Sequence, residues 1–141
     1  MLRNLILSDA KRAAEIMQKS FVDERWSELE ISSMLTDKTF FGYMDEHGFI
    51  LCRRVYETID ICTFCVEPEF QKQGIGRRLL ASVIDYATNN SCEIFLEVAE
   101  NNLPAFNLYK SAGFKEISVR KKYYKTENGL VNAILMKLGG I

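Results

Sequence analysis

Hydrophobic residues recur along the chain at two spacings, and these divide it into expected strands and helices. Apolar runs and period-two alternation predict strands, whereas apolar positions three or four residues apart predict helices. The expected strands span residues 2–7, 40–44, 49–55, 59–66, 93–99, 114–124 and 131–138. The expected helices run from Ser8-Asp9 to about Ser20, from Ser27 to Leu35, from Ile75 to Asn89-Asn90, and from Asn101 or Asn102 to Gly113.

Turn and capping residues support these boundaries. Ser27, with Glu30 three residues later, forms the pattern of a helix capping box. Asp45-Glu46-His47-Gly48 is expected to be a hairpin-like turn, with His47 simply a loop residue. A second turn is expected at Asn128-Gly129.

The order of elements is β-α-α-β-β-β-α-β-α-β-β, without an internal repeat or a linker. Residues 59–99 form a strand-helix-strand unit with short connections, so its two strands are expected to be parallel with a right-handed crossover. We therefore expect a single α+β domain over residues 1–141, built on a mixed sheet.

The composition is that of an ordinary globular protein, with 48% hydrophobic and 26% charged residues among 141. Eighteen Lys and Arg against 19 Asp and Glu leave a formal charge of −1, which argues against bulk electrostatic binding of nucleic acid or anionic lipid. No apolar run suffices to span a membrane, and the N-terminal apolar stretch is too short for a signal peptide. We expect a cytoplasmic protein, with a monomer favoured, that contacts neither membrane nor nucleic acid.

The four cysteines include one C-x-x-C motif, which runs from Cys62 to Cys65. Such a pair could be a redox site or half of a zinc site. The motif lies in an apolar, strand-like run, where residues three apart point to opposite faces, and the chain has only one histidine. We therefore expect small buried thiols and no metal.

The segment Gln71-Lys72-Gln73-Gly74-Ile75-Gly76-Arg77 lies between the strand that Glu67-Pro68 ends and the next helix. Its glycines allow a sharp turn and the close approach of a ligand, and a helix N-terminus presents unpaired N–H groups. Lys72 and Arg77 add positive charge, so the segment suits a pyrophosphate. It is neither a Walker A loop nor a full dinucleotide fingerprint, because the third glycine position is Leu79. The alternative is a tight strand-to-helix turn without a ligand.

Two further side chains are candidates for proton transfer. Glu97 is the charged residue of the apolar strand Ile94–Ala99, where a carboxylate must be paired, raised in pKa or exposed in a cleft. General-base catalysis benefits from such a setting, although Glu97 could also meet water at an edge of the sheet. Tyr109 shares a helix face with Phe106, and taken alone it is more often a core residue than a catalyst.

Together these residues resemble the GNAT family of acetyl-CoA-dependent N-acetyltransferases. The resemblance runs from about Ile59 to Leu138 and rests on the Gln-x-x-Gly-x-Gly-Arg loop, Asn102, Tyr109 and the Gly113-Phe114 step. It implies the acyl-CoA N-acyltransferase fold, a mixed central sheet of about seven strands flanked by about four helices. It also implies acetyl-CoA as the acetyl donor, without a metal.

Within the family the chain looks most like the bacterial ribosomal-protein-alanine N-acetyltransferases. The matching residues are Trp26-Ser27, Leu96-Glu97-Val98, Asn102, Leu108-Tyr109, Gly113-Phe114, Arg120, Tyr123-Tyr124 and Ala133-Ile134-Leu135-Met136. The implied reaction is acetylation of a protein N-terminal α-amine, with the alanine of a ribosomal protein as acceptor. Two alternatives stay open: acetylation of a small amine, an antibiotic or a lysine side chain, and a CoA-binding sensor module without turnover.

The resemblance also implies roles for the site residues. The strand segment Thr63–Val66 would bulge and splay from its neighbour, so that its backbone pairs with pantetheine and an N–H stabilises the oxyanion. Glu97 would be the general base, directly or through a water, and Tyr109 the acid that protonates the departing thiolate. The implied cofactor contacts are Phe64, Cys65, Val66, Lys72, Gln73, Gly74, Ile75, Gly76, Arg77, Tyr109 and, near the thioester, Asn102.

Acceptor chemistry favours direct transfer to an α-amine. An α-amine with a pKa near 8 is about one-tenth neutral at pH 7, whereas a lysine amine near 10.4 is almost wholly protonated. A weakly perturbed carboxylate can therefore suffice as the base. Cys65 could in principle be a nucleophile, but no histidine is suitably placed in the sequence to activate it.

Two charged groups could recognise a macromolecule. The acids Asp23, Glu24, Glu28 and Glu30 could attract a basic N-terminal segment, or form a solvated helix surface. The run Arg120-Lys121-Lys122-Tyr123-Tyr124-Lys125 interleaves basic and aromatic residues, as in RNA-binding segments. Strand alternation would place Arg120, Lys122 and Tyr124 on one face, and the resemblance implies that the tyrosines line an acceptor pocket.

Overall fold

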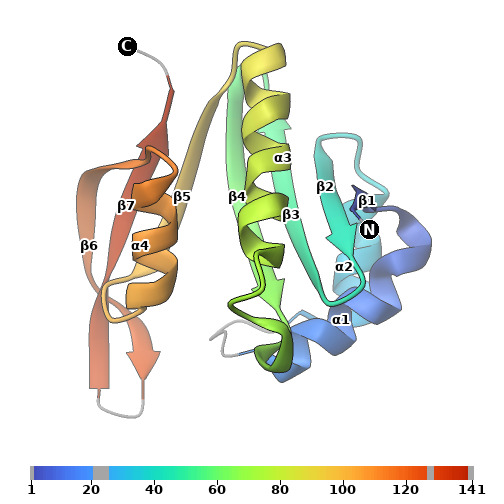
Figure 1. Cartoon of the computed structure of the whole chain (residues 1–141), viewed down its shortest axis with the longest axis horizontal. Helices are drawn as coiled ribbons and strands as arrows, with labels where there is room; N and C mark the ends of the chain where they lie inside the picture. Colours follow the sequence, from blue (N-terminus) through green and yellow to red (C-terminus); the bar gives the residue numbers. More distant parts are fainter. Residues whose placement is uncertain (1, 21–25, 127–128, 140–141) are drawn as a thin grey trace.

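A computed structural model of the chain describes residues 2–20, 26–126 and 129–139, and their side chains outside 122–126. Its strands are β1 (Arg3–Asn4), β2 (Phe40–Asp45), β3 (Gly48–Val55), β4 (Thr58–Val66), β5 (Glu93–Ala99), β6 (Lys115–Thr126) and β7 (Gly129–Leu138). Its helices are α1 (Ala10–Lys19), α2 (Glu28–Leu35), α3 (Ile75–Asn89) and α4 (Leu103–Ser111), with short 3₁₀ turns η1 (Leu7–Asp9) and η2 (Pro68–Phe70). The strands of the described residues form one seven-stranded mixed sheet in the order β1-β2-β3-β4-β5-β7-β6, which confirms the expected fold (Figure 1).

The helices cover both faces of the sheet. Side chains of β3 show the division, because Phe49 and Leu51 pack with α1 and α2, whereas Ile50 and Cys52 pack with α3 and α4. Strands buried on both faces are apolar at successive positions, as β3 is here. The core therefore consists of two layers separated by the sheet.

The expected strand-helix-strand unit is formed by β4, α3 and β5, and β4 and β5 are parallel. The apolar stripe of α3 is buried against the sheet at Leu79, Leu80, Val83 and Ala87. None of the helices in the described part of the chain combines the length and apolar character that crossing a membrane requires.

The parallel strands β4 and β5 pair only near their N-terminal ends. Their register joins Thr58 to Glu93 and ends where Asp60 pairs with Phe95, beyond which the strands diverge (Figure 1). On its other side β4 pairs with β3, and there Cys62 is an extra residue, a β-bulge that bends the strand. The edge of β4 that faces β5 is thus outside their ladder from residue 61 onward. The splay that the family resemblance implies is confirmed, and the bulge lies at Cys62, one residue before the segment Thr63–Val66 in which it was expected.

The first expected strand, at residues 2–7, is shorter than predicted. The carboxylate of Asp9 accepts hydrogen bonds from Arg3 at 2.6 and 2.7 Å and from the backbone N–H of Ile6 at 2.9 Å. These bonds turn the chain back, so that β1 contains only Arg3 and Asn4. The sequence suggested that Ser8-Asp9 caps α1, but the Asp9 side chain makes no capping hydrogen bond to this helix. The turn expected at Asn128-Gly129 extends outside the described residues.

Candidate active site

The segment Gln71–Arg77 leads from the end of β4 into the first turn of α3. Lys72 and Gly74 adopt left-handed conformations, with φ of 63° and 85°. The backbone N–H of Arg78 donates to Gly74 O at 3.0 Å, so the three amides between them precede the first helical hydrogen bond. Exposed basic side chains flank these amides. The segment thus brings together the amides and cations that a pyrophosphate requires.

Gly76 lies where β4, α3 and α4 meet. A Cβ at this position would lie 3.5 Å from Cζ of Phe64 and 3.8 Å from side-chain atoms of Leu108 and Val66. Glycine therefore leaves a methyl-sized space beside the N-terminal turn of α3. The neighbours of this space are apolar side chains of β4 and α4.

Tyr109 lies on α4 in the core layer beneath α3 and α4, and only 7% of its surface is exposed. The centroid of its ring lies 6.2 Å from that of Phe64 and 5.8 Å from that of Phe114. The ring is thus a core residue, as the sequence alone favours. It also contacts β4 from the side of α4, which places Tyr109 beside the diverging part of β4.

Glu97 lies on the opposite face of the sheet from Tyr109. Its neighbours Leu96 and Val98 are buried in the layer with α3 and α4, and alternation along β5 directs Glu97 to the other face. β5 lies between β4 and β7 in the sheet, but at Glu97 it pairs with β7 alone, so one side of the strand is unpaired there. Its side chain is 27% exposed at a position beyond the last β4–β5 pair. The two predicted catalytic residues therefore lie on either side of the diverging strands.

Arg120 forms an ion pair with Glu97 that sequence reasoning missed. Its Nη2 donates to Glu97 Oε1 at 2.7 Å. The contact depends on a β-bulge at Ile117, because the register between β6 and β7 passes from Glu116–Met136 to Ser118–Leu135. Without the extra residue, strand alternation would place Arg120 on the face of α4.

Sequence reasoning also missed a buried ion cluster at Glu67, which was expected only to help end β4. The Glu67 side chain is 4% exposed and accepts hydrogen bonds from Lys19 Nζ at 3.0 Å, from His47 Nδ1 at 3.0 Å and from Arg12. Burial alone would raise the pKa of Glu67, but the bonds from His47, Lys19 and Arg12 outweigh it and lower the pKa to about 2. His47 is therefore more than a loop residue, and its ring also stacks on Phe70 with centroids 3.4 Å apart.

Asn102 is the N-cap of α4, and it is one of the two residues, Asn101 and Asn102, at which this helix was expected to begin. Its side chain accepts a hydrogen bond from the backbone N–H of Ala105 at 3.4 Å. The structure thus gives Asn102 a local role in starting the helix, and its contact near the thioester stays a prediction.

The cysteines differ in burial. Cys52, Cys65 and Cys92 are buried as expected, but Cys62, at the bulge of β4, is partly exposed, so the expectation is wrong there. Cys65 packs in the layer with α1, so only its backbone can face the diverging strands. Burial raises the pKa of the Cys62 thiol to about 11 and also raises that of Cys65. Among the described side chains, no three His, Cys, Asp or Glu residues are grouped to hold a metal ion.

The predicted macromolecular contacts are only partly visible. Asp23 and Glu24 lie outside the described residues, and Glu28 is exposed. Glu30 accepts the backbone N–H of Ser27 at 3.1 Å, which completes the expected capping box. The side chains of Lys122 and Tyr124, which were predicted to share one face with Arg120, lie outside the described side chains.

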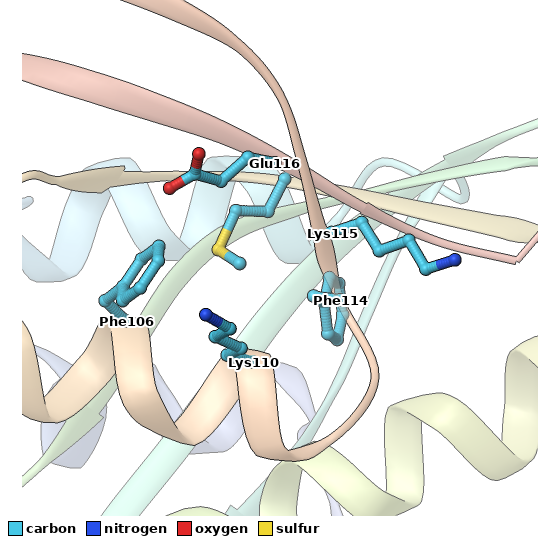
Figure 2. A pocket seen from close by; sticks show the side chains of 6 residues that line it. Phe106, Lys110, Phe114, Lys115 and Glu116 are labelled. Atoms are coloured by element: carbon cyan, nitrogen blue, oxygen red, sulfur yellow. The ribbon is translucent and has the colours of Figure 1, made fainter.

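A separate pocket of about 290 Å³ lies between α4 and the outer strands β6 and β7. Figure 2 shows the Lys110 side chain extending between Phe106 and Phe114. The lining residues are Phe106, Lys110, Phe114, Lys115, Glu116 and Met136. None of the predicted catalytic or cofactor residues lines this pocket.

The diverging parallel strands and the amide-rich start of α3 define the class of protein. Residues 9–114 match the model of the Acetyltransferase (GNAT) family, and the chain belongs to this family. The resemblance inferred from the sequence is confirmed, and family membership makes the chain an acetyl-CoA-dependent N-acetyltransferase.

Individual relatives are similar over most of the chain. The [ribosomal protein bS18]-alanine N-acetyltransferase of Salmonella typhimurium is 34% identical over 117 residues, which are 73% of this chain and 79% of the relative. The crystal structure of the ribosomal-protein-S18-alanine N-acetyltransferase from Escherichia coli has a TM-score of 0.89 and 30% identity, over 98% of this chain and 92% of that one. Arabidopsis thaliana NAA60, solved in complex with acetyl-CoA, shares the fold with a TM-score of 0.82 and 18% identity, over 98% and 97% of the two chains.

Proposed function

We propose that this protein transfers the acetyl group of acetyl-CoA to the N-terminal α-amine of a ribosomal protein that begins with alanine. The relative from Salmonella typhimurium is named for this reaction on ribosomal protein bS18. The observation that carries the proposal is the divergence of β4 and β5, because it opens the sheet between Glu97 on one face and Tyr109 on the other. A donor inserted between the strands can meet an acceptor on one side and a proton donor on the other.

The donor would bind along the diverging part of β4. The backbone of β4 from residue 61 onward is outside the ladder with β5, and an extended pantetheine can pair with it as an added strand would. The pyrophosphate would lie on the first amides of α3, beside Lys72 and Arg77.

Transfer would proceed by direct attack of the acceptor amine on the thioester carbon. A C–N bond forms, the C–S bond breaks, and a β4 backbone N–H stabilises the negative charge that develops on the carbonyl oxygen. Glu97 takes the proton that the amine nitrogen loses, directly or through a water, and the Tyr109 hydroxyl gives a proton to the departing thiolate. The phenolate of Tyr109 recovers its proton from solvent after the products leave.

Arg120 would hold the carboxylate of Glu97 in one orientation. The ion pair uses Oε1 of Glu97. The oxygen that Arg120 does not bind is thus the one suited to accept the amine proton. A base fixed in this way loses less orientational freedom during the reaction.

Cys65 is a poor candidate for an acyl-enzyme nucleophile. Its side chain is 3% exposed, faces α1, and has a thiol pKa raised by burial. A protonated thiol on the face of the sheet away from Tyr109 is a weak nucleophile. Direct transfer needs no such group.

The proposal is tested by release of CoA thiol with three acceptors: a basic peptide that begins with alanine, the same peptide with a blocked α-amine and free lysines, and a small polyamine. We expect rapid release with the first peptide only. Rapid release with the blocked peptide or the polyamine would support the alternative acetylation reactions. CoA binding measured by calorimetry, without release for any acceptor, would support a sensor module instead.

A further inference from the structure

The ion cluster of Glu67 with Arg12, Lys19 and His47 joins three elements of the fold. It lies just before the segment Gln71–Arg77, which is proposed to bind the pyrophosphate. Glu67 follows β4 directly, Arg12 and Lys19 lie on α1, and His47 lies in the turn between β2 and β3. Two guanidinium or ammonium groups and one imidazole surround a single carboxylate that is 4% exposed. A buried carboxylate is stable only with such partners.

Backbone contacts make this junction more rigid. The N–H of Glu67 donates to His47 O at 2.9 Å, and Arg12 Nη2 also donates to Glu46 O at 3.0 Å. The end of β4, the β2–β3 turn and α1 are thus connected by both side-chain and backbone bonds. Movement of Glu67 would break several of them together.

The same junction continues into the pyrophosphate segment. The ring of Phe70 stacks on His47 with an angle of 5° between the planes, and Gln71 Nε2 donates to Val66 O at 3.1 Å. Residues 67–71 are therefore held by the β2–β3 turn and by the end of β4 before the chain enters Gln71–Arg77. Lys72 next adopts a left-handed conformation, which costs energy for a residue with a side chain and persists only where its surroundings hold it.

We propose that Glu67 is a positioning residue for the donor: its ion cluster with α1 and the β2–β3 turn fixes the start of Gln71–Arg77, so that the first amides of α3 converge on the pyrophosphate. The inference rests on the proposed binding of acetyl-CoA to this segment. Glu67 itself lies in the core beside the segment and acts through it, without touching the donor.

Glu67→Gln tests the proposal because it keeps the shape of the side chain and removes its charge. We expect the Kd for CoA, measured by titration calorimetry, to rise about tenfold, which corresponds to about 1.4 kcal/mol. We expect kcat at saturating acetyl-CoA and the KM for the acceptor peptide to change less than about twofold, because the reacting groups stay in place. Glu69→Gln is the matched control, since Glu69 is exposed and makes the same change of charge two residues away.

A second acetyl donor distinguishes a specific effect on pyrophosphate binding from a general loss of activity. S-acetylpantetheine lacks the pyrophosphate, so kcat/KM with this donor should be the same for Glu67→Gln and the wild type. Equal losses with both donors, or an unchanged Kd for CoA, would overturn the proposal. His47→Ala, which removes the contact with Phe70 and leaves Arg12 and Lys19 on Glu67, should raise the Kd for CoA by a smaller factor, and an unchanged Kd there would also count against it. Failure of the wild type to bind CoA would instead refute the proposed function.

Discussion

Replacing Glu67 by glutamine should also lower the stability of the protein, in a way that depends on pH. The cluster lowers the pKa of Glu67 from 4.5 to about 2, and a tenfold change in proton affinity corresponds to about 1.4 kcal/mol, so the ionised carboxylate contributes up to about 3 kcal/mol. The side chains of Arg12 and Lys19 are 36% and 55% exposed, and solvent screens their share. We therefore expect a loss of about 2 kcal/mol in the free energy of unfolding at pH 7.

The direction of the pH dependence follows from the lowered pKa. A carboxylate that is more acidic in the folded protein stabilises it fully above the unfolded pKa, near 4.5, and the contribution disappears as the pH falls through the folded pKa, near 2. The difference between wild type and Glu67→Gln should thus fall below half of its pH 7 value at pH 3. Urea unfolding followed by the fluorescence of the single tryptophan, Trp26, measures it. An equal loss in Glu69→Gln, or a loss that does not shrink at pH 3, would refute the reasoning.

Further predictions concern the proton-transfer pair and the pyrophosphate segment. Glu97→Gln should lower kcat by about 100-fold, most strongly at low pH where fewer acceptor amines are neutral, and Tyr109→Phe should also lower kcat at an unchanged KM for acetyl-CoA. Pre-steady-state release of CoA measures the effect of each substitution on catalysis, and Glu116→Gln, at an exposed position, is the control. Full activity in Glu97→Gln and Tyr109→Phe would refute the roles assigned to these two residues. Gly74→Ala forces alanine to a φ near 85°, at a cost of about 1–2 kcal/mol, and should lower both the Tm and the affinity for CoA. Gly129→Ala carries similar strain at a φ of 107° in the distant β6–β7 hairpin, so it should lower the Tm alone, and an equal effect of the two variants on CoA affinity would contradict the prediction.

Local signals in the sequence predicted most of the fold. The capping box of Ser27 and Glu30 involves residues close together in the chain, and it is present. The strand Glu93–Ala99 was predicted with the bounds it has, because its run of mostly apolar residues is bounded by polar ones on both sides. The first strand was predicted to be too long, because the hydrogen bond from Arg3 to Asp9 crosses a turn that the hydrophobic pattern does not indicate.

Contacts between distant segments account for what the sequence missed in the site. Glu67 is 48 and 55 residues from Lys19 and Arg12, so its burial depends on how α1 packs beside β4. The pairing of Arg120 with Glu97 depends on the bulge at Ile117, which changes the face of β6 that carries Arg120. A bulge is set by the register of two strands rather than by the residues of one, so alternation alone gives the wrong face.

The diverging strands are proposed to present the acetyl group to a protein N-terminal α-amine. One measurement tests it most directly: a basic peptide that begins with alanine and contains lysines is incubated with acetyl-CoA and the protein, and the acetyl group is located by fragmentation mass spectrometry. We expect a single acetyl group on the α-amine of the first residue, formed by the wild type and much more slowly by Glu97→Gln. Acetylation of the lysine side chains with the α-amine unmodified would contradict it.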